Sequence, residues 1–437
     1  MAREYKDSGI EWIGQIPKEW EVCQIRRVMK NRSERNLPNA EVLSLYRDWG
    51  IVPKNSRDDN HNVTSEDTTN YKVVHKGDFV INKMKAWQGS MAVSDYDGII
   101  SPAYYVCEFV RTSVYKRYIH HLLRNESYKT EYMRLSSGLR VGQWDLNIEN
   151  FLRIPMILPS FSEQQKIADY LDKVCGEVDE MVALQETMIE ELKAYKQSVI
   201  TEAVTKGLNP NVPMRNSGID WIGEIPEHWD LARVGLFYFV TKLAGFEYTD
   251  TLMNKISSSD DVPIVRAQNV KMYRFEKESI SEFIDLETSL LLDRCSLNKK
   301  SLLMTFIGAG IGDVCIFNES NRYHLAPNVA KIEKNSDFDN IIYDEYIMYY
   351  LGSDAGKGEI NKISKASAQA SLSMSTIRKI AIAVPPLDEQ RVIASYLDTK
   401  CSEIDSLIAL KQAKIEELKE YKKSVIYEYV TGKKEVV

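Results

Sequence analysis

The run Gly308-Ala-Gly-Ile-Gly312 is the segment of this sequence whose residue types and spacing come nearest to a nucleotide-binding loop. A dinucleotide or S-adenosylmethionine loop follows a strand and opens a helix. Here the run is followed by Asp313-Val-Cys-Ile-Phe317, which has the pattern of a strand. We therefore predict that these glycines form a turn joining two strands.

Other catalytic patterns are missing. The sequence has neither the G-x-x-x-x-G-K-[ST] loop of ATP-binding proteins nor the Asn/Asp-Pro-Pro-aromatic tetrapeptide of amino-methyltransferases. His120 and His121 are adjacent and would point to different faces of a helix, so they are poor metal ligands. The pairs Glu190-Glu191 and Glu416-Glu417 are typical of solvated helix faces. We expect no catalytic residue, no cofactor site and no metal site on this chain.

Two stretches of the sequence occur twice. Residues 7–20, Asp-Ser-Gly-Ile-Glu-Trp-Ile-Gly-Gln-Ile-Pro-Lys-Glu-Trp, match residues 216–229 at an offset of 209. Residues 159–205 match residues 385–431 at an offset of 226, with about half of the positions identical. The segments between the matched blocks are mostly unalike and differ in length by 17 residues. This period is far longer than that of a repeat array, so it indicates a tandem domain duplication.

Each copy of the second stretch predicts a long helix that ends at a glycine, Gly207 or Gly432. Apolar residues recur in steps of mostly four and three, which is typical of a heptad seam. Two helices of about 44 residues would each span on the order of 65 Å. We expect them to pack antiparallel as a coiled-coil spacer, the alternative being two surface helices that each cover their own domain. The predicted seam residues are Ile167, Leu171, Val178, Met181, Leu192, Tyr195, Val199, Ile393, Leu397, Ile404, Leu407, Leu418, Tyr421 and Val425.

The two divergent segments each show strand-like runs followed by a helical stretch. Strands are predicted within 42–46, 78–82 and 104–110 and within 262–266, 301–306 and 313–317, and helices near 114–135 and 344–351. Each segment therefore predicts a mixed α/β, or α+β, domain. The expected organisation is a first globular domain at 1–158, a central helix at 159–207, a second domain at 208–384 and a C-terminal helix at 385–437.

Composition is that of a globular protein, with 44% hydrophobic and 27% charged residues in 437. The net charge is −7, but residues 1–158 carry 23 basic against 20 acidic residues. This balance excludes a strongly basic coat and leaves a local basic face possible. The six scattered cysteines are typical of reduced structural thiols, and no apolar run is long enough for a membrane span or a signal peptide. We expect a cytoplasmic protein.

The chain resembles the specificity subunits of type I restriction–modification systems over nearly its whole length. The motifs that carry the resemblance are the helix entries Pro159-Ser-Phe-Ser-Glu-Gln164 and Pro385-Pro-Leu-Asp-Glu-Gln390, with the repeated Ser-Gly-Ile-x-Trp-Ile-Gly-x-Ile-Pro-x-x-Trp. The resemblance implies two target-recognition domains, each reading one half of a bipartite, asymmetric duplex DNA site. It also implies that the helices set the spacing and dock two methyltransferase subunits, which motor–nuclease subunits then join. S-adenosylmethionine, ATP and Mg²⁺ would be used by those partners.

Given that resemblance, basic and amide side chains in loops are the candidates for DNA contacts. Arg, Lys, Gln and Asn read base edges, and Lys and Arg also bind phosphates. Trp87 and Trp144 are interpreted as packing residues rather than stacking platforms. The candidates are Lys83, Lys85, Gln88, Arg134, Arg140 and Gln143 in the first domain and Arg266, Gln268, Asn269, Lys271, Lys362, Lys365 and Gln369 in the second.

Two other functions remain open from the sequence. The chain could be a self-sufficient DNA methyltransferase or nuclease with unfamiliar motifs. It could also be a coiled-coil scaffold that binds protein and does not read DNA, as its acidic helices would allow.

Overall fold

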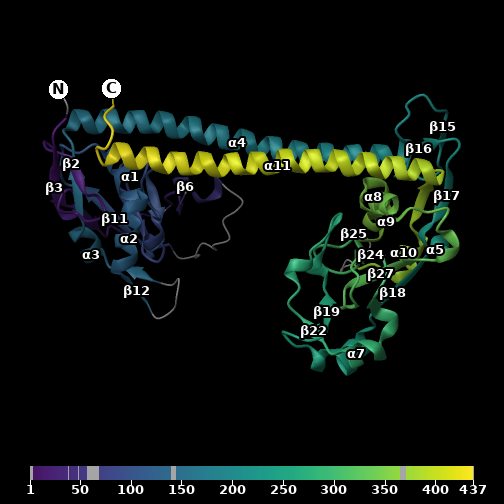
Figure 1. Cartoon of the computed structure of the whole chain (residues 1–437). Helices are drawn as coiled ribbons and strands as arrows, with labels where there is room; N and C mark the ends of the chain where they lie inside the picture. Colours follow the sequence, from purple (N-terminus) through teal and green to yellow (C-terminus); the bar gives the residue numbers. More distant parts are fainter. Residues whose placement is uncertain are drawn as a thin grey trace. The chain divides into compact units, whose positions relative to one another are not determined.

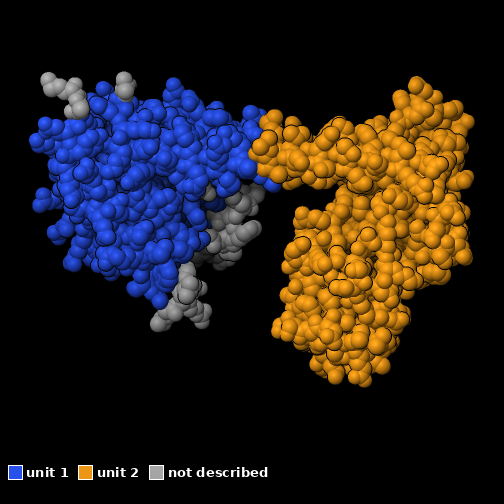
Figure 2. Space-filling model, in the orientation of Figure 1, with its two compact units in different colours: residues 1–186, 412–437 blue, residues 187–411 orange. Residues whose placement is uncertain are grey.

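The structure, a computed structural model, describes residues 3–37, 39–47, 49–56, 68–138, 144–364 and 371–436. It divides into two compact units (Figure 2): residues 1–186 with 412–437 form unit 1, and residues 187–411 form unit 2. Each unit holds one globular domain and part of each of two long helices, α4 (Phe161–Lys206) and α11 (Leu387–Val430) (Figure 1). The mixed α/β class predicted from the sequence, with two globular domains and two long helices, is confirmed.

The domain of unit 1 is built on an antiparallel sheet with the strand order β4-β11-β8-β9. Three helices pack with it, α1 (Lys116–Arg124), α2 (Glu126–Leu135) and α3 (Ile148–Arg153). The sheet strands are β4 (Met29–Arg32), β8 (Phe79–Asn82), β9 (Met91–Val93) and β11 (Tyr104–Phe109). Smaller strand pairs are β1 (Tyr5–Asp7) with β2 (Gln15–Pro17), β3 (Glu21–Gln24) with β14 (Pro155–Leu158), β5 (Leu43–Tyr46) with β6 (Gly50–Pro53), β7 (Lys72–Val74) with β10 (Gly98–Ile100), and β12 (Ser136–Ser137) with β13 (Asp145–Leu146).

The domain of unit 2 repeats that sheet as β18-β27-β24-β25 and adds a second sheet, β22-β19-β26-β23. Its helices are α5 (Val234–Phe237), α6 (Gly245–Glu247), α7 (Leu286–Leu291), α8 (Asp344–Gly352), α9 (Asp354–Ser364) and α10 (Met374–Lys379). The first sheet comprises β18 (Tyr238–Lys242), β24 (Ser301–Thr305), β25 (Val314–Phe317) and β27 (Val329–Lys334). The other strands are β15 (Met214–Asn216), β16 (Glu224–Pro226), β17 (Asp230–Arg233), β19 (Val262–Val265), β20 (Val270–Lys271), β21 (Arg274–Phe275), β22 (Phe283–Ile284), β23 (Ser296–Leu297), β26 (Tyr323–Leu325) and β28 (Ala381–Val384).

The predicted strands and helices are present in both domains. Each of the six predicted strand segments contains a strand, and α8 occupies the helix predicted near 344–351. The helical stretch predicted near 114–135 is two helices, because Asn125 interrupts it with an extended backbone and its side chain accepts a hydrogen bond from Ser127 N at 2.8 Å. The glycine run joins the antiparallel strands β24 and β25, so the predicted turn is confirmed; Gly308 and Gly312 have φ of 103° and 88°.

The first repeated motif packs each domain against the ends of the long helices. In unit 1, Trp20 is fully buried and its Nε1 donates to Glu163 at 3.1 Å in the first turn of α4. A Cβ at Gly432, just after α11, would lie 3.0 Å from that tryptophan ring. In unit 2, Trp229 lies in the same way against Gly207, just after α4. The repeated tryptophan therefore holds the start of one helix beside the end of the other.

The glutamine of each repeated Glu-Gln pair fastens the helix start to its domain. Gln390 is fully buried; its Nε2 donates to the carbonyls of Ile341 and Pro385, both at 2.8 Å, and its Oε1 accepts from Tyr343 N at 2.9 Å. Gln164 makes the equivalent bonds in unit 1, to the backbone of Ser113, Tyr115 and Pro159.

Two buried tyrosines add a matching link to the far helix end. Tyr118 donates to the carbonyl of Val430 at 3.1 Å in unit 1. Tyr346 donates to the carbonyls of Val204 at 3.1 Å and Ala383 at 2.9 Å in unit 2. Both tyrosines begin a Tyr-Ile-x-x-x-Leu pattern, at residues 118–123 and 346–351, which is a short signal within otherwise divergent segments.

We expect Gln390→Ala to destabilise unit 2 by about 3 kcal/mol, since it leaves buried backbone groups of Ile341, Tyr343 and Pro385 without partners. Gln412→Ala, at an exposed position of the same helix, is the matched control and should change stability by less than about 0.5 kcal/mol. Urea unfolding followed by circular dichroism measures both. Equal midpoints for the two variants would show that Gln390 does not fasten the helix.

In each unit the two long helices run antiparallel. In unit 1 the rings of Tyr170 and Tyr429 lie 4.5 Å apart, and Asp179 pairs with Lys422 at 2.6 Å, so positions in α11 fall as those in α4 rise. Unit 2 shows the same order, with Lys411 Nζ 3.3 Å from Met188 Sδ and Lys196 paired with Asp405 at 2.7 Å.

The predicted seam residues differ in burial. Those that are buried or half-buried are Ile167, Leu171, Val178, Leu192, Val199, Ile393, Leu397, Ile404, Leu418 and Val425. Four others are between 45% and 56% exposed, which does not fit a seam position: Met181, Tyr195, Leu407 and Tyr421. Each of these four comes immediately before a half-buried residue, namely Val182, Lys196, Ile408 or Lys422, and the two lysines pair with carboxylates of the other helix. Apolar and long side chains stand at both neighbouring positions, so spacing alone does not show which of the two faces the seam.

Within the described residues, no helix is both long enough and apolar enough to cross a membrane.

Candidate nucleic-acid interface

The first group of candidate residues lies in the loop between β8 and β9. The Lys83 ammonium sits over the Tyr105 ring at 4.7 Å, and Lys85 is exposed. A short 3-10 turn over Ala86–Gln88 follows, and Gln88 Oε1 accepts from Arg47 Nη2 at 3.2 Å. Because that arginine follows β5, two loops meet here on one surface.

Trp87 and Trp144 pack edge to face at 5.2 Å beside this loop, and Trp87 Nε1 donates to the carbonyl of Met84 at 3.1 Å. These contacts agree with the interpretation of both tryptophans as packing residues. The ring contact joins this loop to the residue just before β13.

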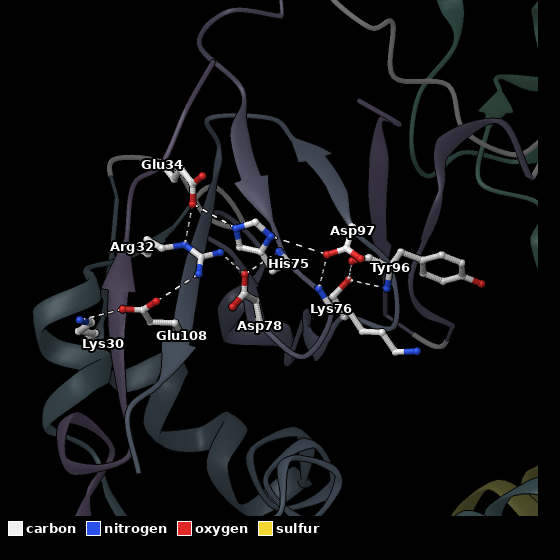
Figure 3. A network of polar contacts seen from close by, with 10 residues as sticks. Lys30, Arg32, Glu34, His75, Lys76, Asp78, Tyr96, Asp97 and Glu108 are labelled. Carbon is white, nitrogen blue, oxygen red and sulfur yellow. Dashed lines mark hydrogen bonds and ion pairs between the residues drawn. The ribbon is translucent and has the colours of Figure 1, made fainter. Parts of the chain in front are cut away.

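The two ends of β8 differ in charge. At its start, Arg32 contacts Asp78, Glu108 and Glu34, and His75 Nε2 lies 3.2 Å from the same Glu34 (Figure 3). The arginine there is neutralised within the protein. At the other end of the strand, neither Lys83 nor Lys85 pairs with a carboxylate of the described residues. Positive charge is thus left open to a ligand at the loop between β8 and β9.

The remaining candidates of the first domain lie at the end of α2. Arg134 is exposed, and both its Nε and Nη2 bind Glu131, at 2.7 and 2.6 Å. The partner carboxylate of Glu131 is buried, so this pair holds the guanidinium at the surface and neutralises part of its charge. Arg140 and Gln143 lie outside the described residues.

In the second domain, the candidates after β19 have unlike surroundings. Arg266 forms an ion pair with Glu282. Asn269 is 1% exposed, and its amide bonds only within the loop, to Glu276 O at 3.2 Å and Ser279 Oγ at 2.8 Å. Asn269 therefore shapes this loop and does not face solvent, whereas Gln268 and Lys271 are exposed. The difference has a physical cause: a buried amide satisfies backbone groups that the turn leaves unpaired.

The end of α9 carries the last described candidate. Lys362 is exposed, with its ammonium 5.3 Å from the centre of the Trp221 ring. Lys365 and Gln369 lie outside the described residues. Lys362 stands in the last turn of α9 as Arg134 does in α2, so the two domains place a cation at corresponding positions.

Sequence reasoning missed three cations near these loops, namely Arg47, Lys242 and Lys357. Arg47 contacts Gln88, and Lys242 lies 5.1 Å from the centre of the Phe306 ring. Burial raises the pKa of Asp313, at the end of the glycine turn, and the charge of Lys357 opposes that shift. Their positions depend on which strands pair, and the sequence holds no local signal for that.

The six cysteines are all buried. Burial raises the pKa of the Cys107 and Cys315 thiols to about 12 and that of Cys175 to about 11, so none is a thiolate at neutral pH. His120 is half-buried, and desolvation of its ring strongly lowers its pKa; His121 Nε2 lies 2.9 Å from Asp172. No cluster of three or more His, Cys, Asp or Glu that could hold a metal ion occurs among the described residues.

Comparison with known proteins supports one family. The sequence model of the type I restriction modification DNA specificity domain matches residues 17–194 and 251–420. The MjaVIII specificity subunit of a type I restriction enzyme from Methanocaldococcus jannaschii is 23% identical, over 96% of this chain and 93% of that protein. The EcoKI specificity subunit from Escherichia coli is 23% identical, over 48% of this chain and 44% of that protein.

Solved structures show the same fold. A chain from a study of complex assembly and conformational transition of the type I restriction–modification system aligns with a TM-score of 0.71. It is 15% identical, and the alignment covers 95% of this chain and 98% of that one. The HsdS subunit from Thermoanaerobacter tengcongensis aligns with a TM-score of 0.50 at 16% identity and the same coverage. With the family's domain matched twice, the chain belongs to the family of type I restriction–modification DNA specificity subunits.

Proposed function

We propose that each globular domain reads one half of a bipartite, asymmetric duplex DNA sequence. The observation that carries this proposal is the repeated sheet, β4-β11-β8-β9 and β18-β27-β24-β25, whose loops differ almost completely in sequence between the two domains. A common scaffold with unlike loops is what two different readers in one chain require. The site need not be palindromic, in contrast to that of a homodimer.

The long helices hold the two readers at a set spacing and dock two methyltransferase subunits. Each unit exposes apolar side chains on its part of the helices, and the set that recurs at equivalent repeat positions is named its apolar patch. In unit 1 the patch consists of Met181 and Leu184 from α4 with Tyr421 from α11; in unit 2 it consists of Leu407 and Leu410 from α11 with Tyr195 from α4. The two patches occupy equivalent repeat positions, which supports two copies of one partner.

Catalysis belongs to the partners in this proposal. The methyltransferase subunits use S-adenosylmethionine, and the motor–nuclease subunits that complete the enzyme use ATP and Mg²⁺. The chain itself works in the cytoplasm as a non-catalytic reader, with residues 1–158 and 208–384 as the readers and 159–207 and 385–437 as the spacer helices.

The direct test is DNA binding by the chain with its methyltransferase subunit. We expect the complex to bind one bipartite sequence at least about 1,000-fold more tightly than random duplex. The chain alone, with its net charge of −7, should bind weakly. Electrophoretic mobility shifts on a randomised duplex library provide the measurement.

Two outcomes would contradict the proposal. Methyl transfer or cleavage by the purified chain alone, supplied with S-adenosylmethionine, ATP and Mg²⁺, would make it an enzyme. A complex that binds all sequences equally would make it a scaffold.

A further inference from the structure

The loop between β8 and β9 has a structural counterpart of equal length in the second domain. The pairing of Ile81 with Met91 matches that of Met304 with Val314, an offset of 223 residues on both strands. In each of the loops between them, residues 82–90 and 305–313, a backbone hydrogen bond joins the first residue to the last. Asn82 N donates to Ser90 O at 3.0 Å, and Thr305 N donates to Asp313 O at 2.9 Å.

The counterparts also share their neighbours. Gly89 and Gly312 fall at the same position of the two loops, with φ of 77° and 88°. The second helix of each domain packs there: a Cβ at Gly89 would lie 2.7 Å from Lys129 Cε of α2, and one at Gly312 would lie 3.4 Å from Ile360 Cδ1 of α9. The correspondence therefore includes the supporting helix as well as the strands.

The two loops present different chemistry from the same place. The first offers long polar and cationic side chains from the sequence Lys83-Met-Lys-Ala-Trp-Gln88. The second, Phe306-Ile-Gly-Ala-Gly-Ile311, has two glycines and an exposed alanine, with Ile307 36% exposed. A loop with such small side chains lets another molecule approach the backbone amides closely.

Positive charge surrounds the second loop from other elements. The Lys242 ammonium lies 5.1 Å from the centre of the Phe306 ring. Burial raises the pKa of Asp313, and the nearby charges of Lys357 and Lys271 oppose that shift. Within the described ranges, none of these three lysines forms an ion pair with a carboxylate at 4.0 Å or less. Lysines without a close ion pair near a small-residue turn favour phosphate binding, and the Asp313 carboxylate at the end of the turn offsets part of their charge.

We propose that the turn from Phe306 to Asp313 is a DNA-contacting, specificity-determining loop of the second domain. Gly308, where a Cβ would meet nothing within 4 Å, admits the sugar–phosphate backbone, the nearby lysines bind phosphates, and Ile307 offers an apolar contact of the kind that a thymine methyl group makes. This inference rests on the proposed DNA-reading function and adds a loop that carries no basic or amide side chain of its own.

The first test places a negative charge on the turn. Ala309 is exposed and has no positive φ, so Ala309→Glu should fold normally while repelling phosphate. In complex with the methyltransferase subunit, we expect at least about 10-fold weaker binding to the selected site. Ala309→Gln keeps the size without the charge and should lose less. Asn298→Glu, exposed before the opposite end of β24, should bind like the unchanged chain.

The second test replaces Ile307–Ile311 with the corresponding Met84–Gln88 sequence, Met-Lys-Ala-Trp-Gln. Selection from a randomised duplex library should then return a site altered in one half only. An unaltered site, together with normal binding by Ala309→Glu, would overturn the inference while leaving the DNA-reading function intact. If the unchanged complex selects no sequence at all, the proposed function fails and this inference fails with it.

Discussion

A chain carrying Leu407→Glu and Leu410→Glu is expected to bind one methyltransferase subunit instead of two. Both leucines are exposed on α11 in unit 2, and Tyr195 of α4 is exposed in the same unit. Burying a leucine at an interface contributes about 2 kcal/mol, and an unpaired carboxylate buried there costs several more. Affinity at that patch should therefore fall by at least about 100-fold.

The repeated layout provides a matched variant. Met181→Glu with Leu184→Glu changes the equivalent patch in unit 1 and should likewise leave one bound subunit. The four substitutions together should leave none. Native mass spectrometry of the purified complexes counts the subunits directly.

The control for this experiment adds the same charge elsewhere on α11. Ser395→Glu with Ser402→Glu changes two exposed residues outside the patch and should retain both methyltransferase subunits. Two bound subunits in the chain with all four patch substitutions would show that the partners dock elsewhere.

The duplication and the two long helices could be predicted from the sequence because the evidence for them is repetitive. Matching motifs at fixed offsets and heptad spacing over more than forty residues do not depend on distant contacts. The sequence does not show which side of each long helix faces the other helix. At Met181 and Val182, or at Leu407 and Ile408, two apolar neighbours compete for the seam, and only packing selects one.

Part of the candidate site has a signal in the sequence. Cations in a loop, such as Lys83 and Lys85, suggest phosphate contacts, and the structure leaves both without a carboxylate partner among the described residues. Asn269 has the same kind of sequence signal, but its side-chain amide is occupied by hydrogen bonds within its own loop. The glycine turn has no such signal, and only the strand pairing shows that it corresponds to the loop of Lys83.

The second large effect is expected from exchanging residues 21–158 for those of a relative with another target. These residues include every strand of the β4-β11-β8-β9 sheet and the loops around it. The second domain and both helices stay unchanged, and the contacts of Gln164 and Tyr118 join the exchanged segment to α4 and α11 mainly through backbone atoms. A relative that keeps the glutamine and tyrosine can therefore preserve this junction.

The measurement that tests the account most directly is methylome sequencing of cells that express this hybrid with the parental methyltransferase. The account predicts a methylated sequence in which one half is new, while the other half and the gap between the halves are those of the parent. A methylated sequence with both halves changed, or with neither changed, would contradict the assignment of one half-site to each domain.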